Sequence, residues 1–254
     1  MGTVTSRDGT PIAFDQAGAG PALILVVGAF NSRATGAPLA QVLEGHFIVL
    51  NYDRRGRGES GDTAPYAVER EIEDLDALIA HTGGSVCVFG YSSGAILAVR
   101  AAAHGLPISR LAFYEPPPTG ARAGELAPQL AELIAAGRRG DAVELFQTEA
   151  VGIPAAVVAQ MRNAPFRPEL EHMAPTLVYE STILTALPTE LLASVRAPTL
   201  VLDGEQSPEV MRQAAHALAD ALPAGRYRTL EGVGHDIVPA VLAPVVAEFF
   251  LAQS

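Results

Sequence analysis

Serine, histidine and carboxylate residues at the ends of apolar runs are the groups in this chain most suited to chemistry. The string GYSSG at residues 90–94 follows an apolar run at residues 86–89 and precedes a helical pattern that starts at Ala95. In such a strand–turn–helix bend, the middle serine projects from the carboxyl end of the strand, and the helix directs its positive end at the same point. The spacing therefore predicts Ser92 as a nucleophile and the Ser93 N–H as a donor to an oxyanion. The alternative is a serine that only caps a helix.

A serine hydroxyl is a weak nucleophile without a base, and His235 is the candidate base. It stands in GVGHD at residues 232–236, after the last apolar run, where chains with this order of groups place the histidine. The other histidines fall in expected helices or at strand entries, where solvated or capping roles are ordinary, although His172 has the further alternative of reaching a substrate. These other histidines are His46, His81, His104, His172 and His216.

The histidine base also needs a carboxylate that holds its ring in the right tautomer. Glu115 follows the apolar run at residues 111–114, and Asp203 and Glu205 end or follow the run at residues 199–202. If these runs are neighbouring parallel strands, all three carboxylates lie at the same edge of the sheet. The residues alone leave the choice among them open.

A second backbone donor to the oxyanion is expected after the first long apolar run, at residues 22–27. Gly28, Ala29 and Phe30 follow this run, and we expect the Ala29 N–H to be the donor. Phe30 and Tyr91 are the expected substrate-binding aromatics, although an aromatic at such a place is as often simply packed.

The elements that must position these groups follow from hydrophobic patterning. Short apolar runs are typical of strands buried on both faces, and stretches of helical period separate them. This alternation predicts an α/β protein with a mostly parallel, doubly wound sheet. Near the N-terminus, Asp8-Gly9 between alternating segments predicts an antiparallel hairpin with a two-residue turn. The expected strands include residues 22–27, 47–50, 86–89, 111–114, 199–202 and 227–230, and the expected helices outside the cap are residues 68–81, 95–104, 208–222 and 239–253.

One stretch interrupts the alternation. Between residues 118 and 196 only helical patterns occur, broken by glycine and proline. We expect this stretch to be a helical cap inserted into a single domain whose core consists of residues 1–117 and 197–254. A cap over the carboxyl ends of the strands would shape a largely apolar pocket at that edge.

Composition argues against several classes of function. The 254 residues carry a net charge of -11, and all 17 cations are arginine. Nucleic-acid binding needs a concentrated basic face, which these dispersed arginines do not form. Without lysine, Schiff-base and P-loop chemistry are excluded. The single cysteine, Cys87, excludes an intrachain disulfide and a thiolate metal cluster.

No apolar run approaches the roughly twenty residues of a membrane span, and no secretory leader pattern opens the chain. We therefore expect a cytoplasmic protein with neither a nucleic-acid nor a membrane partner. The chemistry expected of the serine and histidine requires no metal and no organic cofactor. The oligomeric state is left open.

Several motifs together resemble the α/β hydrolase superfamily over nearly the whole chain. The resemblance implies the α/β hydrolase fold and cleavage of an ester by a serine nucleophile, and it is specific for the superfamily more than for a substrate. The segments that carry it are residues 28–29, 52–60, 90–94 and 234–235.

One departure from the family pattern concerns the acid. Most members carry it shortly after the seventh strand, where this chain has Ser207. Haloalkane dehalogenases and fungal zearalenone lactonases include members with a glutamate after the preceding strand, which implies Glu115 as the acid here. The lactonases also share the string SSGA, residues 92–95 of this chain, whereas the dehalogenases use an aspartate nucleophile.

We therefore expect a hydrolase that cleaves an ester or lactone of a small apolar molecule through an acyl-enzyme. Ser92, His235 and Glu115 form the expected triad, and Ala29 and Ser93 supply the expected oxyanion donors. One alternative keeps these residues but uses them in a cyclase, lyase or acyltransferase of secondary metabolism. Another is a non-catalytic relative that holds a small ligand under its cap.

Overall fold

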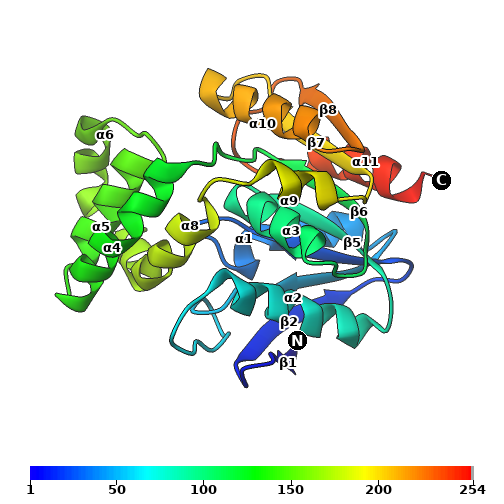
Figure 1. Cartoon of the computed structure of the whole chain (residues 1–254), viewed down its shortest axis with the longest axis horizontal. Helices are drawn as coiled ribbons and strands as arrows, with labels where there is room; N and C mark the ends of the chain where they lie inside the picture. Colours follow the sequence, from blue (N-terminus) through cyan, green and yellow to red (C-terminus); the bar gives the residue numbers. More distant parts are fainter. Residues whose placement is uncertain (253–254) are drawn as a thin grey trace.

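A sheet of eight strands lies at the centre of the part of the protein that this computed structural model describes, residues 1–252 (Figure 1). The strands lie in the order β1-β2-β4-β3-β5-β6-β7-β8, and all pairs from β4 to β8 are parallel. The mostly parallel α/β fold expected from the apolar runs is therefore confirmed. The strands are β1 (Gly2–Thr5), β2 (Pro11–Ala17), β3 (Ala22–Val26), β4 (Ile48–Tyr52), β5 (Val86–Tyr91), β6 (Ile108–Tyr114), β7 (Thr199–Gly204) and β8 (Gly225–Leu230).

The N-terminal hairpin is antiparallel, but its connection is longer than predicted. Residues 6–10 join β1 to β2, so the expected two-residue turn at Asp8-Gly9 is wrong. The Ser6 N–H donates to the Thr10 carbonyl (2.8 Å), and the Asp8 carboxylate accepts from the Thr10 N–H (3.0 Å). These bonds stabilise a five-residue turn, because the aspartate side chain binds the backbone two residues ahead.

Helices cover both faces of the sheet. Leucine, isoleucine, valine and alanine side chains of one group of helices fill the core on one face, and those of α1 and α11 fill the core on the other. Four of these helices begin and end within a few residues of the predicted ranges. The first group includes α2 (Val68–Thr82), α3 (Ser93–Ala103) and α10 (Glu209–Ala221), and the second consists of α1 (Arg33–Leu43) and α11 (Pro239–Leu251).

The helix α1 is not predicted by the sequence pattern, because Gly36 and Pro38 interrupt it. The structure begins this helix after Ser32, whose side chain accepts a hydrogen bond from the Ala34 N–H (3.3 Å). Packing of its apolar side against the sheet outweighs the low helix propensity of these two residues. Among residues 1–252, no helix combines the length and apolar character that a membrane span requires.

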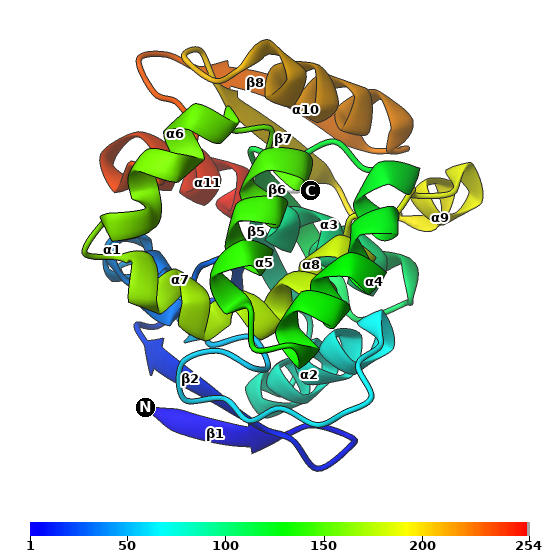
Figure 2. The ribbon, with the colours of Figure 1, turned by 90° about the vertical axis from the view of Figure 1, so that its left-hand side faces the viewer.

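Between β6 and β7 the chain forms a separate helical layer, which lies to one side of the sheet in Figure 1 and in front of its strand ends in Figure 2. The last helix of this stretch, α9 (Thr189–Ser194), instead packs on α3 and α10. The range predicted as a cap, residues 118–196, thus includes one helix that lies on the core. The layer consists of α4 (Ala121–Ala135), α5 (Arg139–Leu145), the π-helix η1 (Phe146–Ala150), α6 (Ala155–Gln160), the 3-10 helix η2 (Met161–Asn163), α7 (Arg167–Met173), the 3-10 helix η3 (Ala174–Thr176) and α8 (Leu177–Ile183).

We call this layer, α4 to α8, the cap. It has an apolar cluster of its own, and Ala29 and Phe30 from the loop after β3 pack against that cluster. The rings of Phe30 and Phe146 meet edge to face with their centroids 5.7 Å apart. The cap therefore rests on the loop in which the sequence predicts an oxyanion donor. The buried members of the cluster are Leu126, Leu130, Ala142, Val143, Phe146, Ala174 and Leu177.

Candidate active site

Ser92 lies at a sharp bend between β5 and α3. Its backbone has φ 54° and ψ −128°, and a positive φ is uncommon for residues other than glycine. Ser92 occupies the N-cap position of α3, yet its hydroxyl makes no capping hydrogen bond within residues 1–252. The helix-cap alternative therefore has no support, and the strained bend presents the hydroxyl at the end of the strand.

Two glycines let neighbouring segments approach this bend closely. A Cβ on Gly94 would collide with the backbone carbonyl of Val26 in β3. A Cβ on Gly28 would lie 2.8 Å from Ser92 Cβ and 3.0 Å from the Tyr91 carbonyl oxygen. Side chains do not tolerate such distances, so glycine is required at both positions.

Glu115 follows β6, the strand next to β5. The Ser92 N–H donates to the Tyr114 carbonyl (2.9 Å), and the Glu115 N–H donates to the Leu202 carbonyl (2.9 Å). These bonds bring the carboxyl ends of β5, β6 and β7 side by side. Glu115 is fully buried and, with φ 56°, is another left-handed residue that is not glycine.

Both oxygens of the Glu115 carboxylate have partners. Oε1 accepts from the Gly204 N–H (2.7 Å) and the Ser207 hydroxyl (2.8 Å), and Oε2 lies 3.3 Å from His235 Nδ1. Burial raises the pKa of this carboxyl, but the hydrogen bonds from His235, Gly204 and Ser207 outweigh burial and hold the pKa below its ordinary value. Glu115 is therefore an anion that orients the imidazole and leaves Nε2 for another partner.

The two other candidate acids have different partners. Asp203 is buried and accepts from the Tyr227 hydroxyl (2.6 Å), while Glu205 is exposed and accepts from a backbone N–H after β8. Neither carboxylate hydrogen-bonds to His235 in the part of the chain that the structure describes. Of the three carboxylates left open by the sequence, Glu115 is the one in contact with the histidine.

His235 lies in an exposed loop between β8 and α11, beside the bend. The hydroxyls of Tyr91 and Tyr114 donate to the backbone carbonyls of His235 (3.0 Å) and Gly234, and the Tyr91 and His235 ring centroids are 5.1 Å apart. Because Tyr91 directly precedes Ser92, the histidine lies close to the candidate nucleophile. Within residues 1–252 no hydrogen bond joins Ser92 to His235, and in catalytic sites such bonds often tighten only when substrate binds.

These contacts change the role expected for Tyr91. Its side chain is 6% exposed, its hydroxyl binds the His235 carbonyl, and its ring stacks on that of Tyr114. A buried phenol that is bonded inside the protein has little left to offer a substrate. These contacts favour a role for Tyr91 in holding the histidine loop over the expected role in binding substrate.

The backbone donors near Ser92 also differ from the expectation at one position. The Ala29 N–H donates to the Ser93 hydroxyl (3.0 Å) and is thus already used within the protein. The N–H groups of Ser93 and Phe30 have no acceptor among the described residues. Phe30 has φ 57°, so the three left-handed residues other than glycine in the described chain are Phe30, Ser92 and Glu115. Strained backbone of this kind often clusters at functional sites.

The comparisons with known proteins agree with this architecture. A model of the alpha/beta hydrolase family matches residues 23–248, which is most of the chain. The chain belongs to the α/β hydrolase family. An α/β hydrolase from Sphaerobacter thermophilus, known from its crystal structure, is 52% identical to it, with a TM-score of 0.90 and coverage of 98% of this chain and 100% of that chain.

Two relatives of this α/β hydrolase have named activities. The pimeloyl-[acyl-carrier protein] methyl ester esterase of Xanthomonas campestris is 27% identical over 242 residues, which cover 87% of this chain and 90% of the esterase. The N-formylmaleamate deformylase of Pseudomonas putida is 38% identical over 107 residues, which cover 41% of this chain and only 40% of the deformylase. Both names describe hydrolytic enzymes, and they support a hydrolase activity for this family member.

A buried set of charges beneath the site is not anticipated by the sequence analysis. Arg54, Arg57, Glu71 and Glu180 are each at most 2% exposed and lie in contact with one another. The one signal that could have indicated them is the run of charges at residues 53–57, directly after a buried strand. Glu180 belongs to the cap and gives no local signal at all.

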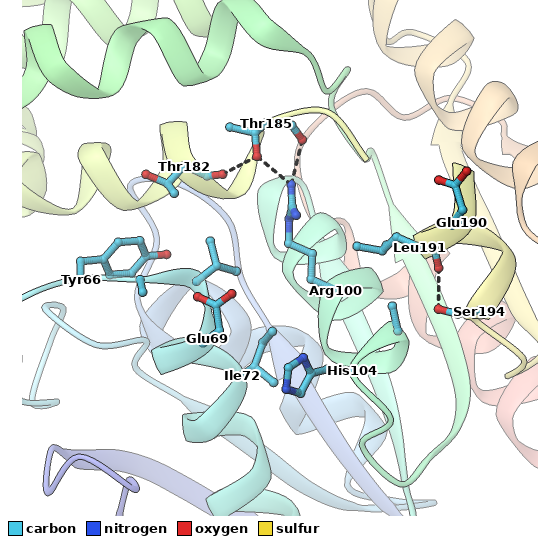
Figure 3. A pocket seen from close by; sticks show the side chains of 13 residues that line it. Tyr66, Glu69, Ile72, Arg100, His104, Thr182, Thr185, Glu190, Leu191 and Ser194 are labelled. Atoms are coloured by element: carbon cyan, nitrogen blue, oxygen red, sulfur yellow. Dashed lines mark hydrogen bonds between the residues drawn. The ribbon is translucent and has the colours of Figure 1, made fainter. Parts of the chain in front are cut away.

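A cavity of about 690 Å³ lies between α2, α3 and the chain from α8 to α9, and none of the expected triad residues lines it (Figure 3). Arg100 of α3 points toward Thr185 and donates to its backbone carbonyl (2.8 Å) and hydroxyl (2.9 Å), as well as to the Ile183 carbonyl (3.0 Å). The guanidinium is therefore engaged within the protein. Its bonds attach the end of the cap helix α8 to the core.

Metal-binding side chains do not gather in the described chain. Within residues 1–252, no group of three histidine, cysteine, aspartate or glutamate side chains is placed to hold a metal ion. At the candidate active site, Glu115 and His235 bind each other.

Proposed function

We propose that this α/β hydrolase cleaves a carboxylic ester or lactone of a small apolar molecule through an acyl-enzyme on Ser92. The observation that carries the proposal is the contact of Glu115 with His235 (3.3 Å) beside the left-handed bend at Ser92. The named activity of the Xanthomonas campestris relative, a methyl ester esterase, supports an ester as the substrate.

In the acylation step, each residue of the site would have a separate role. The Ser92 hydroxyl attacks the carbonyl carbon while His235 Nε2 takes its proton, and Glu115 stabilises the imidazolium that forms. The N–H groups of Ser93 and Phe30 bind the oxyanion, with Phe30 in place of Ala29 because the Ala29 N–H already has an acceptor. His235 then returns the proton to the departing alkoxide as the carbon–oxygen bond breaks.

Deacylation repeats these steps with water. His235 removes a proton from the water, the hydroxide attacks the acyl carbon, and the same two N–H groups bind the second oxyanion. The acid product leaves, and Ser92 recovers its proton from His235. For a lactone, the alcohol released in the first half remains part of the same molecule.

The cap supports an apolar substrate. Partly buried Phe30, in the loop that follows β3, packs against the buried apolar cluster of the cap and meets the ring of Phe146 edge to face. Apolar groups near a pocket favour apolar ligands, with a few polar groups fixing the orientation. Phe30 therefore remains our candidate for a substrate-binding residue.

The test compares Ser92→Ala with the native protein on aryl esters, macrolactones and an N-formyl amide. We expect Ser92→Ala to lower kcat at least about a thousandfold, because the nucleophile is removed. A fluorophosphonate should label the native protein at Ser92 and leave the variant unlabelled. Ser85→Ala is the matched control, since Ser85 is exposed and its hydroxyl donates to the Pro107 carbonyl (3.0 Å), away from the triad.

Product mass and labelling separate the alternatives. Hydrolysis adds one water to the substrate, whereas cyclisation or acyl transfer does not. Unchanged turnover by Ser92→Ala would refute the proposal. Binding of these ligands without turnover or labelling would instead indicate a non-catalytic protein.

A further inference from the structure

A neutral cluster of two arginines and two glutamates lies beneath the loop that follows β3. Arg54 Nε binds Glu71 Oε2 (2.6 Å), and Arg54 Nη1 binds Glu180 Oε1 (2.7 Å). Arg57 also binds Glu180 Oε1. Three of these residues belong to the core, whereas Glu180 belongs to the cap helix α8. The cap thus places one carboxylate inside the core.

The arginines in turn hold the backbone beside the nucleophile. Arg57 Nη1 donates to the carbonyls of Gly28 (2.5 Å) and Asn31 (3.2 Å). Arg54 Nη1 donates to the Val27 carbonyl (3.2 Å). Residues 27–31 are therefore fixed by two guanidinium groups, and this segment contains the Phe30 N–H to which we assign the oxyanion.

The two arginines do not depend on Glu180 equally. Arg54 keeps a second carboxylate, Glu71, if Glu180 is lost, but Glu180 is the only carboxylate paired with Arg57 in the described chain. Burial raises the pKa of Glu180, but the charges of Arg54 and Arg57 outweigh burial and hold the pKa below its ordinary value. A buried guanidinium without a counter-ion is unfavourable, so loss of the Glu180 charge would displace Arg57.

We propose that Glu180 is a positioning residue supplied by the cap, which acts through Arg57 to hold residues 28–31 and the Phe30 amide in place for oxyanion binding. This inference rests on the function proposed above. It couples the cap to the catalytic step, because a displacement of α8 moves Glu180 and, through Arg57, the segment that contains the Phe30 N–H.

The test measures kcat, KM and inhibition by a trifluoromethyl ketone, which forms an oxyanion on Ser92. We expect Glu180→Gln to lower kcat about 10- to 100-fold, less than the loss of a whole oxyanion donor, with a change in KM below about threefold. Inhibition by the ketone should weaken by about the same factor as kcat/KM. A merely structural role would not link these two quantities.

One control separates positioning from loss of stability. Asp74→Asn removes a buried carboxylate that pairs with Arg55 (2.7 Å) and makes no hydrogen bond to residues 27–31. We expect it to lower the Tm while leaving kcat within about twofold of the native value.

If Glu180→Gln does not fold, the double variant Arg57→Met/Glu180→Met removes both charges and replaces them with apolar side chains of similar length, which proteins often tolerate. It should fold, be labelled at Ser92 and still show the reduced kcat. A kcat within twofold of native in whichever variant folds, or an equal loss in Asp74→Asn, would overturn the inference. A native protein that neither turns over esters nor is labelled at Ser92 would instead show that the proposed function itself fails, and the inference with it.

Discussion

Glu115 and Asp203 are both fully buried carboxylates near the ends of neighbouring strands, yet they have different partners. Glu115 binds His235, whereas Asp203 binds the Tyr227 hydroxyl. Most members of the family carry the triad acid after the seventh strand, where this chain has Ser207. Its hydroxyl donates to Glu115, whereas an aspartate at this position would repel the Glu115 carboxylate. The serine at position 207 and the glutamate at position 115 therefore belong to one arrangement.

This arrangement predicts opposite outcomes for two similar substitutions. Glu115→Gln should lower kcat by about 10² to 10⁴, because a neutral amide neither fixes the tautomer of His235 nor stabilises its cation. Asp203→Asn should leave kcat within about threefold, since its side chain does not contact the histidine. Steady-state kinetics on an aryl ester measures both. A larger loss of kcat in Asp203→Asn than in Glu115→Gln would instead indicate Asp203, at the end of β7, as the triad acid.

The strand β3 and the helix α3 approach each other so closely beside Ser92 that one position between them has no room for a side chain. α3 begins directly behind β3, and Gly94 in its first turn faces the Val26 carbonyl. A helix start in this place also directs its positive end and its free N–H groups toward Ser92. Close packing of the helix on the sheet is thus part of how the Ser92 hydroxyl is presented.

We expect Gly94→Ala to lower the free energy of unfolding by about 1–3 kcal/mol, because the added methyl group forces α3 away from β3. Urea denaturation followed by far-UV circular dichroism measures the change. Gly84→Ala is the matched control, since a methyl group added to Gly84 would point into open space and the φ of this residue is not left-handed. It should change the free energy of unfolding by less than about 0.5 kcal/mol. Equal effects of the two substitutions would contradict the packing argument.

The whole molecule consists of a core and a cap that share buried polar contacts. Glu180 of α8 lies among core arginines, and Arg100 of the core donates to the carbonyls of Ile183 and Thr185. Separation of the cap would deprive the buried Glu180 and the partly buried Arg100 of these partners. The two parts are therefore expected to unfold together.

This cooperativity can be measured with a probe confined to the cap. The chain contains no tryptophan, so Phe146→Trp introduces a single reporter within the apolar cluster of the cap. We expect its fluorescence and the far-UV circular dichroism to change at the same urea concentration. The native protein, followed by circular dichroism alone, shows whether the substitution is tolerated. A fluorescence transition at lower urea than the circular dichroism transition would show that the cap unfolds separately.

The sequence alone determined the elements and the order of the chemical groups along the chain. Apolar runs, helical periods and the GYSSG string are local signals, because each depends on the conformation of residues that are close in sequence. They placed Ser92 at the bend after β5 and His235 in the loop after β8. Local signals did not predict α1, because Gly36 and Pro38 interrupt its helical pattern. Packing against the sheet stabilises this helix.

The tertiary structure decided which groups meet, among them Glu115 and His235, whose pairing the family resemblance implies and the residues alone leave open. The contact of Glu115 with His235 spans 120 residues, and that of Arg57 with Glu180 spans 123. The bond from Ala29 N–H to the Ser93 hydroxyl, which changed the expected oxyanion donor, spans 64. The physical reason is that such contacts depend on how strands and helices pack against one another, and residue types alone do not specify partners at these separations.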